Sequence, residues 1–331
     1  MDLNVGAIEG LAATIAGADS VVPVGARTHW EVGNPCAPGT EIAAPAGVMR
    51  YEPEDLTITV GAGTSFATLA AALAEYGQEC ALDPRDPSAT IGGIVASGLS
   101  GVRRLRHGPL RDHVLEVRFV TADGRLVKGG GQTVKNVTGY DLPRLLVGSF
   151  GTLGVLVQLT LRCRPRAETA RWFRVDALND ANAADFYRAA SLLYDGASTH
   201  VLLEGATADV DAQARGLSTV DRPALPSGPH RGRISVAPNE LPAVGRALDD
   251  LPGARWCAEI GVGTVHVAGD DGAVVSGART IAHAHGGWLL REAGAAGIDG
   301  FGCELPNAAL MRRVKDAFDP AGKLAPGRLP L

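Results

Sequence analysis

The feature that most constrains this chain is the uneven distribution of its glycines. The sequence contains 43 glycines in 331 residues, close to double the average share of about 7%. They follow no fixed period, which excludes a collagen-type repeat. They are concentrated in a few segments, where the missing side chain lets the main chain approach a ligand closely. We therefore expect a globular protein whose ligand site is built from glycine-rich loops.

Length and charge narrow the class further. At roughly 100–200 residues per domain, 331 residues predict two domains. The composition, 46% hydrophobic and 20% charged, is that of a globular protein. The formal charge of -5 lacks the excess of basic residues that is typical of a nucleic-acid-binding protein. Residues 1–20 lack the features of a signal peptide, and no apolar run approaches the ~20 residues of a membrane helix. We expect a cytoplasmic protein without direct membrane insertion, which associates with a membrane only through partners.

The cysteines are odd in number, widely spaced and free of any C-x-x-C pair. This pattern predicts free thiols in a reducing compartment. It also argues against an iron–sulfur cluster or a structural zinc held by this chain alone. The five positions are Cys36, Cys80, Cys163, Cys257 and Cys303.

Strand and helix patterns are clearest in the first half. Short β-branched runs predict strands at 21–24, 57–60, 114–121 and 155–161. Residues 65–77 predict a helix with Thr64 or Ser65 at its start and Gly77 at its end. Asp123-Gly124 predicts a hairpin with a return strand at 126–128. Pro165 ends the last strand and marks the expected domain boundary.

The second half is less regular. We expect helices at 181–194, 243–251, 273–285 and 308–318, strands at 234–236 and 263–267, and an exposed loop at 217–233. Strands and helices do not alternate in a regular βαβα order, so the prediction is the α+β class.

Three glycine-rich motifs remain after the common nucleotide signals are excluded, because neither G-x-G-x-x-G nor a P-loop occurs. The first is the loop 23–30, a sharp turn that either holds an anion on its main-chain N–H groups or is an ordinary turn. The second, 83–101, contains Gly92-Gly93 and suits either a ligand or close helix–sheet packing. The third is 135–155.

Together the motifs resemble the FAD-binding domain of the vanillyl-alcohol oxidase or para-cresol methylhydroxylase (PCMH) type, closest to the E subunit of bacterial glycolate oxidase. The segments are VGARTHWEVG, DPSATIGGIVASGLSG, RHGPLRDHVLEVRFVTADG, VKNVTGYDLPRLLVGSFGTLGVL and, at the C-terminus, FDPAGKLAPGRLP. The resemblance covers about residues 20–165, with a weaker tail from Met311. It implies a PCMH-type domain of two α/β subdomains at 1–165, a smaller α+β cap domain at 166–305, and a segment at 306–331 that returns to the flavin.

The resemblance also assigns contacts with non-covalent FAD. The pyrophosphate loop comprises Pro23, Val24, Gly25, Ala26, Arg27 and Thr28. The ribityl and phosphate segment begins at Asp83 and Pro84 and continues with Thr90, Ile91, Gly92, Gly93 and Ala96. The loop near the isoalloxazine comprises Gly98, Gly101, His107 and Gly108, braced by a charge-assisted hydrogen bond between Arg111 and Asp112. The adenine side comprises Gly151, Gly154 and Val155, and Arg328 lies where the tail returns.

Two features depart from the family pattern. The first loop reads ARTHW where many relatives have GGGT, so it carries more side chain. His29 stands where some members of the superfamily bond a histidine covalently to the flavin. The alternative is a polar loop histidine, as in relatives of the E-subunit type. The basic run Arg103, Arg104, Arg106 and Arg111 is either a solvated surface or, at Arg111, part of the flavin loop.

The chemistry implied by the resemblance is oxidation of a small 2-hydroxy acid, which needs a base for the hydroxyl proton and a cation for the carboxylate. No catalytic residue is assigned. Arg279, Arg291 and Arg312 are carboxylate candidates, with surface ion pairing as the alternative. His283-Ala284-His285 and His266 suggest a metal only weakly, so no metal is expected.

Three interpretations stay open. The chain is an FAD-binding subunit working with a D-type flavoprotein and an iron–sulfur F-type subunit, a non-catalytic electron-transfer scaffold, or a stand-alone oxidase.

Overall fold

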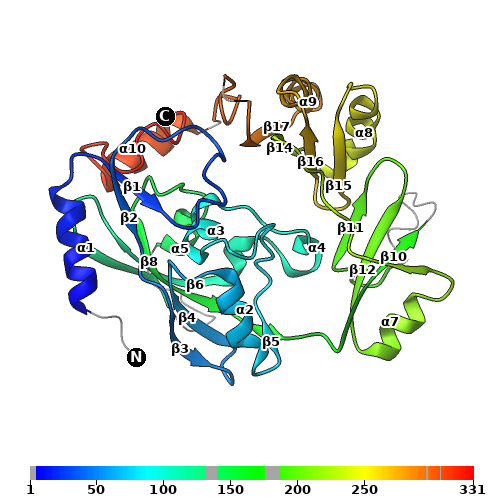
Figure 1. Ribbon diagram of the computed structural model, residues 1–331, viewed down its shortest axis with the longest axis horizontal. Coiled ribbons are helices and arrows are strands. Elements are labelled where there is room, and N and C mark those ends of the chain that lie inside the picture. The colour runs from blue at the N-terminus through cyan, green and yellow to red at the C-terminus, as the bar shows by residue number, and fades with distance from the viewer. Residues whose placement is uncertain (1–4, 132–139, 176–185, 296, 306) are drawn as a thin grey trace.

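The protein is built around two antiparallel β-sheets that lie side by side (Figure 1). The computed structural model describes residues 5–131, 140–175, 186–295, 297–305 and 307–331. One sheet comes from the first half of the chain and the other from the second half. Helices and strands mix in both parts, so the predicted α+β class is confirmed.

The first sheet has five strands in the order β3-β4-β8-β6-β7. Their bounds are β3 Val48–Glu52, β4 Thr57–Gly61, β6 Val114–Val120, β7 Leu126–Gly130 and β8 Val155–Arg162. The predicted strands at 57–60, 114–121 and 155–161 are confirmed. The hairpin is confirmed too, since Gly124 has a φ of 84° and β6 pairs antiparallel with β7.

Two helices cover this sheet and form its core. In α2, Phe66–Ala74, the Ser65 side chain accepts a hydrogen bond from the Thr68 N–H at 3.1 Å, which caps the predicted start. In α3, Ile91–Ser97, Thr90 does the same for the Gly93 N–H at 3.2 Å. The buried core includes Leu69, Leu73, Ile91, Ile94, Val117, Phe119 and Leu159.

A smaller unit joins the two ends of the chain. Helix α1, Val5–Gly17, precedes β1, Val21–Val24, which pairs in parallel with β2, Thr40–Ala43. Val21 also bridges to Leu324, and the Lys323 ammonium donates to the carbonyl of Ile15 at 2.7 Å. Helix α10, Ala308–Phe318, therefore lies near the N-terminal elements, as Figure 1 shows in red. The shorter elements of this half are β5 Gln78–Glu79, β9 Arg164–Pro165, α4 Arg104–His107 and α5 Leu142–Leu146.

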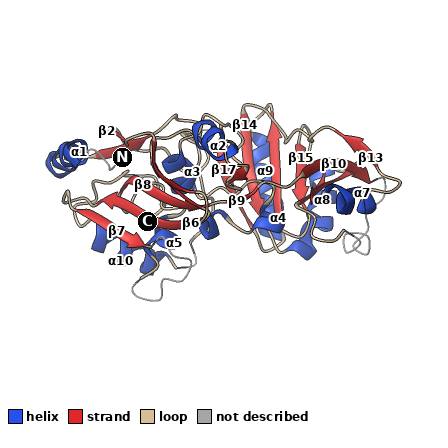
Figure 2. Ribbon diagram, turned by 90° about the horizontal axis from the view of Figure 1, so that it is seen from below, coloured by secondary structure: helices blue, strands red, loops and turns tan. Residues whose placement is uncertain are grey.

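The second sheet has eight strands in the order β13-β10-β12-β11-β15-β16-β14-β17, all paired antiparallel. Their bounds are β10 Thr169–Val175, β11 Ser191–Tyr194, β12 Thr199–Gly205, β13 Ser218–Val220, β14 His230–Ser235, β15 Arg255–Glu259, β16 Thr264–Gly269 and β17 Trp288–Ala293. Helices α7 Thr207–Gln213, α8 Leu241–Asp249 and α9 Ala273–Ala284 pack against it. Figure 2 shows both sheets from below.

The structure corrects two predictions in this half. The predicted helix at 181–194 is wrong where it can be checked, because Ser191–Tyr194 is strand β11; residues 181–185 lie outside the described part. The loop expected at 217–233 contains β13 and the start of β14. Both strands find partners distant in sequence, which a local pattern does not reveal. The helices expected at 243–251, 273–285 and 308–318 are confirmed by α8, α9 and α10.

The two sheets meet across a short connection. The first sheet ends with Arg162 and the second begins with Thr169, so the change of sheet falls near Pro165. The domain limits at 165 and 305 stay predictions.

Among the helices that the structure describes, none is both long and apolar enough to cross a membrane. All five cysteines are free.

Candidate functional site

A cavity opens where the β1 loop, the start of α3 and the segment before β8 meet. Six of its lining residues are glycines, namely Gly25, Gly63, Gly92, Gly93, Gly151 and Gly154. All of these glycines except Gly63 were predicted. The other predicted residues in the lining are Pro23, Val24, Ala26, Arg27, Thr28, His29, Thr90, Ala96, Val155 and Arg328. The structure thus brings together residues from all three motifs. Part of the third motif, 132–139, lies outside the described residues.

The glycines are required by close main-chain approach. A methyl group on Gly25 would overlap Thr90 Oγ1, the atom that caps α3. Gly151 has a φ of 76°, and a methyl group there would lie 2.9 Å from Pro23 Cγ. At these positions the cavity wall carries no side chain, which lets the main chain approach a ligand with phosphate groups.

Two arginines and an indole form one end of this cavity. The guanidinium groups of Arg27 and Arg328 lie 4.5 Å and 5.0 Å from the centre of the Trp30 ring. Arg27 is paired with Glu41 at 2.6 Å. Arg328 is only 8% exposed and donates to the carbonyl of Asn34 at 2.8 Å. Burial lowers the pKa of Arg328, and no ion pair neutralises it among the described residues. An anionic ligand would compensate this buried charge.

A second cavity adjoins the first and lies between the two sheets. Thr28 and His29 line both cavities. The second has a volume of about 170 Å³, several times the roughly 30 Å³ that one water molecule takes in the liquid. It includes the predicted residues Asp83, Pro84 and Gly101, and it also contains Arg85, Arg222, Arg231, Arg233, His266 and Glu292.

One arginine of the second cavity is neutralised by a buried carboxylate. Arg233 on β14 donates through Nε to Glu292 Oε1 on β17 at 2.8 Å, and through Nη1 to the carbonyl of Ser100 at 2.9 Å. Burial opposes the charge of Glu292, but Arg233, His266 and Arg85 outweigh it and lower the pKa of Glu292 to about 2. Glu292 is therefore a fixed anion and a poor proton acceptor.

His29 is the titratable residue on the wall shared by the two cavities. Ser97 Oγ donates to the carbonyl of Ile94 at 3.0 Å, so it accepts a hydrogen bond from His29 Nδ1 at 3.3 Å. This fixes the proton on Nδ1, so the lone pair of the neutral imidazole lies on Nε2. Burial lowers the pKa of His29 most, Glu292 and Gly93 oppose this, and the imidazole is neutral near pH 7.

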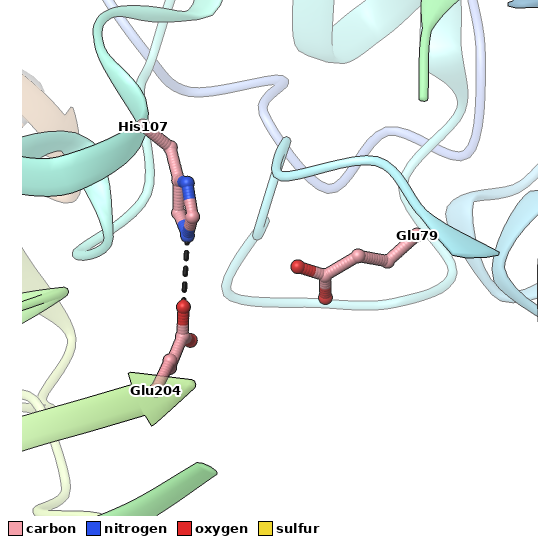
Figure 3. Close-up of side chains that lie close together, drawn as sticks. All are labelled: Glu79, His107 and Glu204. Atoms are coloured by element: carbon pink, nitrogen blue, oxygen red, sulfur yellow. Dashed lines mark hydrogen bonds and ion pairs between the residues drawn. The ribbon is translucent and has the colours of Figure 1, made fainter. Parts of the chain in front are cut away.

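Several predicted residues lie outside both cavities. His107 belongs to an ion-pair cluster, where its Nε2 lies 2.9 Å from Glu204 Oε2 on β12 (Figure 3). Arg111 and Asp112 are 4.0 Å apart, an ion pair rather than a hydrogen bond. Gly98 ends α3 with a φ of 70° and packs against Gly148. Ile91 is fully buried in the core, and Gly108 lies against Asp112.

The cluster around His107 has the composition of a metal site. Ligand atoms of Glu79, His107 and Glu204 lie within 4.8 Å of one another. Figure 3 shows the two carboxylates coming from different parts of the chain. However, Arg103 Nη1 lies 3.0 Å from Glu79 and 3.1 Å from Glu204 and already supplies the positive charge. We interpret the cluster as an ion-pair junction between the sheets.

Sequence reasoning missed the arginines of the second cavity. The candidates Arg279 and Arg291 instead donate to the carbonyls of Asp299 and Gly33. A usable signal was present in Arg231-Gly232-Arg233, because residues two apart on a strand point to the same face. Trp30, Cys36 and Phe150 of the first cavity were missed as well.

The sequence comparisons identify the first half of the chain. Residues 8–130 match the family described as FAD binding domain. The cofactor expected from the sequence is thereby confirmed as FAD. The glycines and Trp30 of the first cavity fit a dinucleotide with two negative phosphates. So does the buried Arg328, which forms no ion pair with any residue that the structure describes.

Curated relatives match part of this chain. The glycolate oxidase subunit GlcE of Escherichia coli is 41% identical over 145 residues, 43% of this chain and 41% of that protein. D-lactate dehydrogenase of Archaeoglobus fulgidus is 42% identical over 118 residues, 36% of this chain and 27% of that protein. The glycolate oxidase subunit GlcD of Bacillus subtilis is 36% identical over 128 residues, 38% and 27% respectively. The matches span less than half the length of each relative.

Structure comparison extends the likeness beyond the FAD-binding domain. A solved structure of alkyldihydroxyacetonephosphate synthase aligns with 96% of this chain and 74% of its own, with a TM-score of 0.68 and 13% sequence identity. At this identity the likeness concerns the fold. The eight-stranded sheet is therefore part of a shared architecture.

Proposed function

We propose that this chain is the FAD-binding subunit of an oxidoreductase that acts on a small 2-hydroxy acid, as in glycolate oxidase. The observation that carries the proposal is the contact between the two cavities at Thr28 and His29. A small molecule in the second cavity would lie directly beside the cofactor. The relatives named as a glycolate oxidase subunit and a D-lactate dehydrogenase support the substrate class.

Bound FAD would supply the electron acceptor, and the residues of the chain would hold the cofactor and the acid. The glycine loops and Arg328 bind the cofactor and balance its negative charge. The arginines of the second cavity bind the carboxylate of the acid. His29 takes the hydroxyl proton on Nε2, because its Nδ1 is engaged with Ser97.

The partners belong to the same proposal. A D-type flavoprotein and an iron–sulfur F-type subunit would complete the complex, since the names GlcE and GlcD denote subunits of glycolate oxidase. The widely spaced free cysteines support a cluster on a partner rather than on this chain. The second candidate is a flavin-bearing electron-transfer subunit whose partner holds the substrate.

The test is the visible spectrum of the purified chain. We expect flavin bands that move into the supernatant after acid precipitation, because no covalent link holds the cofactor. Anaerobic addition of glycolate or D-lactate should bleach these bands without a partner. Stable colour with either acid would favour the electron-transfer subunit. Colour retained in the pellet would point to a covalent link at His29. A colourless protein that FAD does not reconstitute would refute the proposal.

A further inference from the structure

Two arginines of the second cavity form no ion pair with a carboxylate among the described residues. Four arginines line this cavity. Arg233 is paired with Glu292 at 2.8 Å, and Arg222 lies 3.8 Å from Asp83. In the part of the chain that the structure describes, Arg85 and Arg231 form no ion pair. Arg231 is partly buried, and a partly buried cation is normally compensated by an anion, whereas Arg85 is exposed and is defined by its hydrogen bonds.

Arg231 has unused hydrogen-bonding capacity. It lies on β14, and its Nη1 donates to the carbonyl of Gly228 at 3.0 Å. Its Nε is buried without a hydrogen-bond partner among the described residues. A buried guanidinium donor left without an acceptor is costly, so the side chain is suited to an acceptor that arrives with a ligand.

Arg85 is held in place by a buried histidine–glutamate pair. Glu259 Oε1 accepts a hydrogen bond from His266 Nε2 at 2.8 Å, which fixes the proton on Nε2. The lone pair of His266 Nδ1 then accepts from Arg85 Nη2 at 3.3 Å. Arg85 Nη1 donates to the carbonyl of Pro226 at 3.0 Å. Because both nitrogens of His266 are engaged, this residue orients Arg85 and takes no proton from a ligand.

We propose that Arg85 and Arg231 form the binding site for the carboxylate of a small organic acid, and that His266 and Glu259 act as positioning residues for Arg85. The inference rests on the proposed function and deepens it, since it assigns the acid group to named side chains. The planar guanidinium group carries parallel donors that match a carboxylate. The acid would then reach toward His29 on the shared wall.

The probe is oxalate, a carboxylate ligand that has no hydrogen on carbon and is not oxidised by hydride loss. The FAD-loaded full chain is titrated with oxalate, and binding is followed by calorimetry and by the change in the flavin spectrum. We expect Arg85→Gln and Arg231→Gln each to weaken oxalate binding roughly ten- to hundredfold, as for a lost charged hydrogen bond. Arg85→Lys should keep only part of the affinity. The matched control is Arg246→Gln on the exposed face of α8, which should change nothing.

The positioning role is tested by a pair of substitutions at His266. His266→Leu removes the acceptor for Arg85 and should weaken oxalate binding. His266→Gln restores an acceptor and a donor and should recover much of the loss, which a purely structural role would not produce. FAD content, read from the spectrum, reports that each variant is folded.

The outcomes separate this inference from the proposed function. Oxalate that does not bind, that binds equally to both arginine variants, or that is matched in affinity by inorganic phosphate would overturn the carboxylate site. If oxalate binding depends on Arg85 and Arg231 but glycolate and D-lactate leave the flavin oxidised, the site stands and the proposed oxidation by this chain fails.

Discussion

At the scale of single residues, position matters more than residue type. The chain has eight histidines, and their partners give them different roles. His266 uses both nitrogens inside the protein, and His285 pairs with Glu240 at 3.0 Å. His29 keeps a free nitrogen at the wall between the two cavities. The tautomer set by Ser97 therefore distinguishes the candidate base from the other two.

We expect His29→Gln to slow anaerobic flavin reduction by glycolate roughly 10²- to 10⁴-fold, the usual contribution of a general base. The amide cannot accept the proton, while FAD should still bind. In the wild type, burial lowers the pKa of His29, so the neutral base persists at neutral pH and reduction slows only in acid, below the usual 6.5. Stopped-flow measurement from pH 5 to 8 checks both points. His283→Gln, at an exposed position in α9, is the control, and an unchanged rate in His29→Gln would rule out this role.

His113 should make the protein sensitive to acid. Both of its ring nitrogens are buried without a hydrogen-bond partner among the described residues. Burial, followed by the charges of Arg164 and His107, lowers its pKa from 6.5 to about 4. The unfolded chain therefore binds a proton between these pH values while the folded chain does not, and stability falls as the pH drops through this window.

The expected result for His113→Leu is a free energy of unfolding that changes less between pH 6.5 and 4 than in the wild type. Urea denaturation at several pH values measures this difference. The two proteins should differ least near pH 7.5, where the histidine is neutral in both states. Parallel pH curves for the two proteins would contradict the assignment.

At the scale of elements, the first cavity, the proposed FAD site, depends on the contact between the β1 loop and the start of α3. Gly25 lies against Thr90, and Thr90 caps the helix through Gly93. The helix has only seven residues, so the loss of its cap affects a large share of it. Loop and cap therefore act as one unit in shaping the cavity.

Gly25→Ala should lower FAD affinity at least about tenfold, because the new methyl group displaces Thr90 and costs the cap roughly 1 kcal/mol besides distorting the loop. Flavin fluorescence during titration measures this affinity. Gly10→Ala in α1 is the matched control, since no atom lies within 4 Å of the added methyl group. That variant should bind FAD normally and gain about 0.5–1 kcal/mol in stability. Equal FAD affinity in both variants would argue against the loop contact.

The sequence predicted the elements whose signals are local. The Ser65 cap, the Asp123-Gly124 turn and the helices α8 and α9 follow from neighbouring residues. The order of the eight-stranded sheet does not, because β14 lies between β16 and β17 while following β13 in the chain. The short motifs predicted most of the loops that line the first cavity. The second cavity could not, since it combines a loop at Arg85 with strands more than a hundred residues later.

At the scale of the whole molecule, a charged junction connects the two halves of the chain. Arg103 contacts Glu79 on β5 and Glu204 on β12, and it lies 3.7 Å from Asp83. Burial alone would lower the pKa of Arg103, but these three carboxylates raise it. One partly buried guanidinium thus holds together negative groups from both halves of the chain.

Arg103→Met should destabilise the protein by about 3–5 kcal/mol, because it leaves the buried Glu204 and the partly buried Glu79 and Asp83 without their shared counter-charge. Urea denaturation measures the loss, and limited proteolysis should detect earlier cleavage between the sheets, near residue 165. Arg125→Met is the control, because Arg125 pairs with Asp123 on the surface and such pairs contribute roughly 0–1 kcal/mol. Equal free energies of unfolding for the two variants would show that the ion pairs of Arg103 do not stabilise the protein.

The closing of the chain on itself has a consequence for biosynthesis. Arg328 reaches the carbonyl of Val32, 296 residues earlier, and Ala325 and Arg328 line the cofactor cavity. During translation, the glycine loops emerge from the ribosome long before the residues that complete their cavity. Cofactor loading into the finished site must therefore follow synthesis of residues 325–328, so a nascent chain cannot use bound FAD in that site to assist its earlier folding.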